Sequence, residues 1–146
     1  KRGMKPSYFP KRLPEALAIL ALNQFKKLEK FNQHRQEIAN FYRHALKELS
    51  SFGLPLESEQ IYLRFTIKHP RAHEIIKKAW QKNLLIGDWY ASSIAPHDTQ
   101  LEKMRYIPGS CPKAEKLAKE TLNLPTHINI SKEDAKKITE FLKQWR

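Results

Sequence analysis

The sequence has few cysteines and glycines and lacks several short motifs on which common classes of protein depend. It holds a single cysteine, Cys111, so it can form no internal disulfide and no cysteine cluster for zinc. Its four glycines stand at positions 3, 53, 87 and 109, too far apart for a dinucleotide-binding turn or a phosphate-binding loop. The Gly-x-Ser-x-Gly pattern of many hydrolases is absent as well. Serine hydrolysis and nucleotide hydrolysis are therefore not indicated for this chain.

The sequence also lacks an apolar run of about 18 residues, the length that a membrane-spanning helix needs. The apolar stretch from Leu13 to Leu22 is shorter, and no small-residue cleavage site follows it, so it does not fit a signal peptide. Because the chain has one cysteine and no membrane segment, we expect a soluble protein of the reducing cytoplasm.

Acidic residues are in the minority. The 27 lysines and arginines against 15 acidic residues give a net charge of +12, which suits a polyanionic partner such as nucleic acid. The lysines are dispersed over several expected helices, for example as Lys26-Lys27 and Lys136-Lys137, which is typical of solvated faces. No nucleic-acid-binding motif accompanies the charge, so we do not expect nucleic acid as a partner. A stand-alone basic binding module for a polyanion remains the alternative interpretation.

Residues 1–12 have no apolar period and contain Gly3, Pro6 and Pro10, which predicts an irregular lead-in or linker. From Leu13 to about Leu49, apolar residues recur at helical spacing with a weak point at 32–34, which predicts one long helix or two in sequence. Further helices are expected at about 70–82, after Pro112, and at the C-terminal end. The last of these follows the capping pattern Ser131-x-x-Asp134.

Three short strands are expected between these helices. Apolar residues alternate from Ile61 to Ile67, which predicts a strand with one buried face, and residues 84–86 and 122–124 are two further short apolar runs. Helices alternating with short strands predict a small α+β domain, with helices on one side of a sheet.

Two histidines, His69 and His73, are separated by one helical turn, as in a pair of metal ligands. Pro70 places His69 before the helix, and no third ligand is indicated nearby. We therefore expect a pair of surface histidines and no metal site.

The segment from Asp88 to Gly109 is the longest expected loop, and long loops inside compact domains are often functional. It begins Asp88-Trp89-Tyr90 and continues to His97, so a carboxylate, two large aromatic rings and an imidazole lie close in sequence. We predict that it forms a wall of a ligand pocket, where Tyr90 and His97 offer hydrogen bonds and Trp89 a stacking surface. The alternative is that the aromatic rings only anchor the loop to the core.

Six segments resemble, in order and spacing, the closing region of the DegT/DnrJ/EryC1/StrS aminotransferases. They are Arg12-Leu13-Pro14-Glu15, Gln24-Phe25, Asn32-x-x-Arg35-x-x-Ile38-Ala39-x-x-Tyr42, Gly87-Asp88-Trp89-Tyr90, Cys111-Pro112-x-Ala114-Glu115 and Leu124-Pro125-Thr126-His127. The resemblance implies that residues 13–146 are the small C-terminal domain of the aspartate-aminotransferase-type fold. In that family a large domain precedes this one, and the protein works as a homodimer.

The implied activity is transfer of an amino group from an amino acid to a nucleotide-linked keto sugar, with pyridoxal phosphate as the cofactor. In the family, the lysine that bonds to this cofactor belongs to the large domain, so the resemblance assigns no catalytic residue here. We therefore do not expect this chain alone to transaminate. The chain starts at Lys1 with an irregular basic arm, as a cut inside a longer protein would leave it, although Met4 as a native start stays open.

The resemblance also suggests substrate-binding residues. Arg12 matches an arginine that approaches the active site and suits an anionic phosphate or carboxylate. Tyr90 and His97 lie in the loop that meets substrate in the family. Pro10 stands where the family usually has an asparagine that reaches the cofactor phosphate, so no cofactor-binding residue is assigned. That departure leaves open an inactive relative kept as a binding or scaffold domain.

Overall fold

The computed structural model describes residues 11–56, 60–96 and 98–146. The described chain opens with two consecutive helices, α1 (Glu15–Phe25) and α2 (Leu28–Leu46), so the second of the two helical alternatives is confirmed. The break falls at residues 26–27, earlier than the weak point in the sequence. The remaining elements are β1 (Arg64–Lys68), α3 (Ala72–Gln81), η1 (Glu102–Met104), α4 (Pro112–Glu120), β2 (Thr121–Pro125), α5 (Lys132–Leu142) and η2 (Lys143–Trp145).

The two strands pair antiparallel and form the sheet. Phe65 lies opposite Leu124 and Ile67 opposite Leu122, and all four side chains are buried in the core. Thr66 and Asn123 face each other at the position between these pairs, so their side chains point to the other face of the sheet.

Each edge of this sheet is extended by one bridge, Gly53 with Lys68 and Gly87 with Asn123. The predicted strand at 84–86 is therefore wrong, because Gly87 makes the only pairing there within the described chain. The Leu84 N–H donates to the carbonyl of Ala79, and the Ile86 N–H donates to Leu84. These local bonds occupy donors that a strand would offer to its neighbour.

The first predicted strand is correct in kind but begins later than expected. Ile61 and Leu63 were expected on its buried face, yet both side chains are exposed. Regular pairing starts only at Arg64, opposite Pro125. The chain before it leaves the sheet, and Tyr62 is buried instead.

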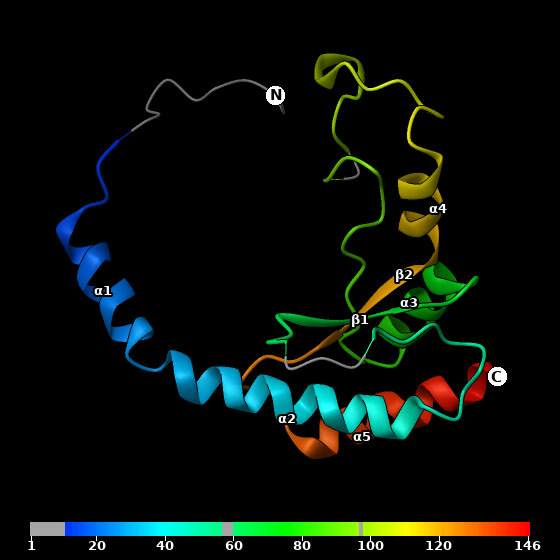
Figure 1. Cartoon of the computed structure of the whole chain (residues 1–146), viewed down its shortest axis with the longest axis horizontal. Coiled ribbons are helices and arrows are strands. Elements are labelled where there is room, and N and C mark those ends of the chain that lie inside the picture. Colours follow the sequence, from blue (N-terminus) through cyan, green and yellow to red (C-terminus); the bar gives the residue numbers. More distant parts are fainter. Residues whose placement is uncertain (1–10, 57–59, 97) are drawn as a thin grey trace.

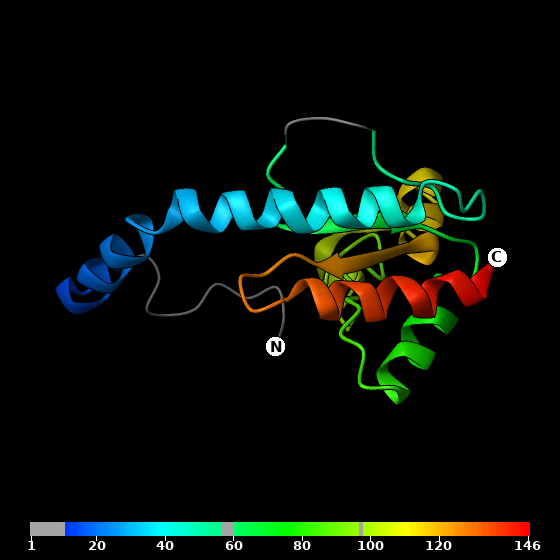
Figure 2. The same ribbon diagram turned by 90° about the horizontal axis from the view of Figure 1, so that it is seen from below.

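The core lies between the sheet and the helices that pack on it. Helices α2 and α5 contact each other and run side by side in the same direction, while α3 contacts β2 and α4 (Figures 1 and 2). The Tyr42 hydroxyl on α2 donates to the Pro125 carbonyl at 3.0 Å, and burial raises the pKa of Tyr42. The expected α+β layer structure is thus confirmed. No helix in the described ranges has the length and apolar character to cross a bilayer.

Asn123 connects the sheet to the loop that follows Gly87. Its side chain is buried; its carbonyl accepts from the Gly87 N–H at 2.8 Å and its N–H donates to the Gly87 carbonyl at 2.9 Å. The Asn123 Oδ1 atom accepts from the Thr66 hydroxyl at 2.7 Å. The Asn123 Nδ2 group donates to the carbonyl of Trp89. One residue therefore fixes the start of the loop over the non-core face of the sheet.

The capping box at the start of α5 is formed as the sequence predicts. The Asp134 N–H donates to Ser131 Oγ at 3.1 Å, and the Ser131 N–H donates to the Asp134 carboxylate at 3.2 Å. Bonds from the Ser131 hydroxyl and N–H hold the pKa of Asp134 below its usual value. Ionised Asp134 therefore stabilises the folded state above the pKa that it has when unfolded, and this stabilisation is lost as the pH falls through the folded-state value.

We predict that Ser131→Ala lowers the free energy of unfolding by about 1 kcal/mol at pH 7. The difference in the free energy of unfolding between the two proteins should narrow toward pH 3. Protonation of Asp134 then weakens, in the unsubstituted chain, the bond from the Ser131 hydroxyl to the carboxylate, which the variant lacks at every pH. Urea unfolding at pH 7 and pH 3 measures this. Ser50→Ala at an exposed position is the control, and an equal loss in both variants would contradict the role of the cap.

We also predict that Asn123→Asp loosens the loop. The substitution keeps an acceptor for Thr66, but it removes the donor to the Trp89 carbonyl and sets a carboxylate oxygen against it. Heteronuclear NOE values of residues 88–91 should fall. Thr66→Val is the matched control, because it removes the other side-chain bond of Asn123 and should leave these values unchanged. Unaltered loop values in Asn123→Asp would show that Asn123 does not hold the loop.

Candidate functional site

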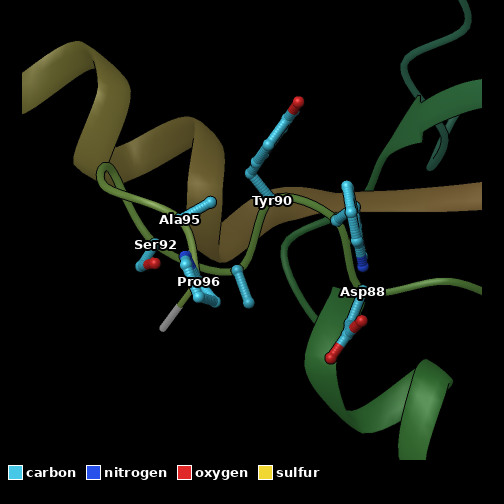
Figure 3. A pocket seen from close by; sticks show the side chains of 7 residues that line it. Asp88, Tyr90, Ser92, Ala95 and Pro96 are labelled. Atoms are coloured by element: carbon cyan, nitrogen blue, oxygen red, sulfur yellow. The ribbon is translucent and has the colours of Figure 1, made fainter. Parts of the chain in front are cut away.

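The loop after Gly87 surrounds a pocket of about 330 Å³. The residues that line it all come from this loop and combine aromatic, small apolar and polar side chains. They are Asp88, Trp89, Tyr90, Ala91, Ser92, Ala95 and Pro96. Figure 3 shows Asp88 and Tyr90 pointing in opposite directions from the chain, with Ser92, Ala95 and Pro96 together at the other end of the pocket. We call this cavity the loop pocket.

A second hollow of about 500 Å³ adjoins it, and we call it the sheet groove. Asp88 and Trp89 line both cavities. The groove is otherwise lined by residues from α2, from α3 and the segment that follows it, and from the two strands and the residues next to them. They are Arg35, Leu63, Arg64, Trp80, Leu85, Ile86, Gly87, Asn123, Pro125, Thr126 and His127.

Two arginines give the sheet groove its positive charge. The Arg64 guanidinium lies 4.4 Å from the centre of the Trp89 ring, a cation–π contact. Arg35 on α2 donates to the Leu63 carbonyl at 3.1 Å, which directs its side chain toward the same groove. The groove thus combines cationic and aromatic surfaces, whereas the described residues that line the loop pocket include no lysine or arginine.

The far end of the loop is fastened to α4. The Tyr106 hydroxyl and the Gly109 N–H both donate to Glu115 Oε1, at 2.7 and 2.6 Å. These two bonds hold the pKa of Glu115 below its usual value. The loop is therefore tied at both ends, to Asn123 near its start and to Glu115 near its finish.

The structure places one of the three predicted substrate-binding residues in the pocket. Tyr90 lines it, with 59% of its surface exposed, beside Trp89 at a distance of 5.8 Å between ring centres. Arg12 is exposed just before α1, and both views place that part of the chain apart from the loop (Figures 1 and 2). His97 and Pro10 lie outside the described residues.

Sequence reasoning missed the contributions of Asn123, Arg64 and Arg35. Asn123 stands between two buried leucines in β2, and a polar residue inside a buried strand is a signal that it has a bonding role. Nothing in the local pattern around Arg64 or Arg35 indicates a groove, because the residues that line it come from four separate parts of the chain.

The expected surface pair of histidines is wrong for His69. Its ring is buried against Phe52, with 4.7 Å between ring centres, and its Nδ1 atom accepts from the Arg71 N–H at 3.0 Å. Burial lowers the pKa of His69. His73 Nε2 lies 3.1 Å from the Ala118 carbonyl instead of facing a shared ligand. Within the described ranges, no three His, Cys, Asp or Glu side chains gather as metal ligands.

Comparisons with solved structures support the fold. The chain is similar to S. venezuelae DesV, described in complex with a ketimine intermediate, with a TM-score of 0.79 and 23% identity over 99% of this chain and 40% of that one. It is also similar to Helicobacter pylori PseC, an aminotransferase of pseudoaminic acid biosynthesis, with a TM-score of 0.77 and 20% identity over 97% of this chain and 42% of that one.

Sequence comparisons give the family. A pleiotropic regulatory protein of Geobacillus stearothermophilus is 26% identical over 159 residues, which cover 98% of this chain and 42% of that protein. The chain therefore spans about two fifths of the length of these relatives. The model of the DegT/DnrJ/EryC1/StrS aminotransferase family matches residues 7–143. Since that match covers nearly the whole chain, the chain belongs to the DegT/DnrJ/EryC1/StrS aminotransferase family.

Proposed function

We propose that this chain is the C-terminal domain of a pyridoxal-phosphate-dependent aminotransferase that acts on nucleotide-linked keto sugars with an amino-acid donor. Family membership supports the aminotransferase class, and structural relatives such as PseC and the putative sugar aminotransferase Spr1654 of Streptococcus pneumoniae support a sugar substrate. The chain spans only about two fifths of its relatives, which supports a domain of a larger enzyme. We propose that this enzyme is cytoplasmic.

Helix α1 is the observation that carries this proposal. Its large side chains are apolar on all sides, and none of its residues is buried. Seven of them in and beside the helix are 46 to 70% exposed: Leu13, Leu17, Ile19, Leu20, Leu22, Phe25 and Leu28. A helix that is apolar all round is stable only when it is covered. We propose that an upstream large domain and the second subunit of a homodimer cover it.

We do not expect the described residues to form a pyridoxal phosphate site by themselves. This cofactor needs a lysine amine at its carbonyl carbon, and neither the loop pocket nor the sheet groove has a lysine in its lining. Pyridoxal phosphate supplies an electron sink for amino transfer when it is bound. In our proposal the upstream domain holds it, and this chain contributes a wall of the substrate site.

The contributions of individual residues follow from this arrangement. Tyr90 lines the loop pocket and is proposed to hydrogen-bond the substrate, together with His97. Arg12 is proposed to bind an anionic group of the substrate in the assembled enzyme, where α1 is packed. An isolated chain leaves Arg12 in solvent.

The polyanion-binding alternative rests on net charge alone. Several lysines are paired with acidic side chains one helical turn away, as Lys116 with Glu120 and Lys136 with Glu140, which is typical of solvated helix faces. If the alternative is correct, the chain binds nucleic acid with an affinity that falls steeply as the salt concentration is raised. This affinity does not depend on the presence of a nucleotide-linked sugar.

We predict that the purified chain forms no specific lysine adduct when it is mixed with pyridoxal phosphate and reduced with borohydride. Absorbance and peptide mass spectrometry measure this. The protein that also contains the large domain should form one adduct and should convert a nucleotide-linked keto sugar to its amine with an amino-acid donor. A single modified lysine in the chain alone would overturn the division of roles proposed here.

We predict that the double substitution Leu17→Glu with Leu20→Glu leaves the stability of the chain nearly unchanged, because neither side chain is buried. The variant should bind less of the dye 8-anilinonaphthalene-1-sulfonate and self-associate less than the unsubstituted chain, since its exposed apolar surface is smaller. Leu117→Glu changes an exposed leucine on α4 and is the control. Equal dye binding in all three proteins would contradict an uncovered interface on α1.

A further inference from the structure

Asp88 is a polar side chain of the site to which the contacts described above assign no role. It lies directly after Gly87, which is fixed by two backbone hydrogen bonds to Asn123, so its place in the chain is well determined. The residue is half-buried and lines both the loop pocket and the sheet groove. Among the described residues, its carboxylate has no hydrogen-bond or ion-pair partner. A carboxylate in this position has acceptor capacity that remains available to a ligand.

The other surfaces of the loop pocket limit which ligand fits. Trp89 and Tyr90 follow Asp88 with 56% and 59% of their surfaces exposed, so both rings are accessible. Among the described residues, the pocket lining contains no lysine or arginine, and its one charged residue is Asp88. A phosphate inside this pocket would therefore meet a like charge without a counterion.

Aromatic rings beside an unpaired carboxylate suit a sugar ring. The C–H faces of a sugar are apolar and pack on aromatic rings, while its hydroxyl groups are donors that a carboxylate accepts. The volume of about 330 Å³ lies within the range of small-ligand pockets. A phosphate of the same molecule has a favourable place on the other side of Trp89, where Arg64 and Arg35 line the sheet groove.

We infer that Asp88 is a specificity-determining residue that accepts hydrogen bonds from the hydroxyl groups of the substrate's sugar ring, which packs against Trp89 and Tyr90 in the loop pocket. This inference rests on the proposed function, because it concerns the sugar part of the nucleotide-linked substrate. The inference adds that a carboxylate of this domain recognises the sugar, and that the diphosphate lies toward Arg35 and Arg64 in the sheet groove.

The test titrates the ¹⁵N-labelled chain with two probes, UDP-glucose and UDP, and follows amide chemical shifts. UDP-glucose should shift the amides of residues 90–92, which line the loop pocket and not the sheet groove, whereas UDP should shift only residues that line the groove. Asp88→Ala should weaken UDP-glucose binding by about ten- to a hundredfold, as expected for loss of hydrogen bonds to a charged group. Its UDP binding should be no weaker, because a negative charge has been removed.

Two further variants make the result specific. Asp88→Asn keeps the shape and part of the bonding capacity, so its loss for UDP-glucose should be smaller than that of Asp88→Ala. Glu102→Gln neutralises an exposed carboxylate in the same loop that lines neither cavity, and it should bind both probes as the unsubstituted chain does. The amide spectrum of each variant also reports whether it is folded.

The inference is overturned if Asp88→Ala binds UDP-glucose as tightly as the unsubstituted chain. It is also overturned if UDP alone shifts residues 90–92 to the same extent, or if UDP-glucose shifts none of them. These readouts need neither pyridoxal phosphate nor turnover. A failure of the transamination assay with these binding results intact would therefore count against the proposed function and not against the sugar contact.

Discussion

The candidate site depends on a single buried amide. Asn123 uses its backbone to pair with Gly87 and its side chain to join Thr66 on β1 with Trp89 in the loop. A buried amide that lost one of these partners would remain desolvated without compensation, which gives the arrangement one favoured geometry. The rings and the carboxylate that follow Gly87 inherit their positions from this residue. The shape of the loop pocket therefore depends on the sheet as well as on the loop that lines it.

The local sequence pattern was enough to predict the helices whose first turn is marked by a characteristic residue. The helix after Pro112 and the cap at Ser131 were predictable, because a proline in the first turn and a serine before an acidic residue act over one helical turn. Alternation identified β1, but it could not reveal that Ile61 and Leu63 lie outside the ladder. Where pairing begins is decided by the partner strand, since Arg64 pairs with Pro125, 61 residues further along the sequence.

The same distinction applies to the site. Aromatic side chains and a carboxylate together in one loop indicated a pocket wall, and Tyr90 lies there. The sheet groove was not predictable, because Arg35, Arg64 and His127 meet only through the packing of α2 against the sheet. His69 was misjudged for a related reason. Its immediate sequence neighbours, Lys68 and Pro70, are both exposed, and the ring that packs on His69 belongs to Phe52, in the segment between α2 and β1.

The contact between Arg64 and Trp89 has a thermodynamic consequence for any ligand that reaches both cavities. The guanidinium covers part of a ring that also borders the loop pocket. An anion that draws Arg64 into the groove alters the aromatic surface offered on the pocket side. Occupation of the two cavities is then energetically linked, and each ligand group changes the affinity of the other by the same factor. For the nucleotide-linked sugar proposed above, that linkage through Trp89 would couple binding of the sugar to binding of the diphosphate.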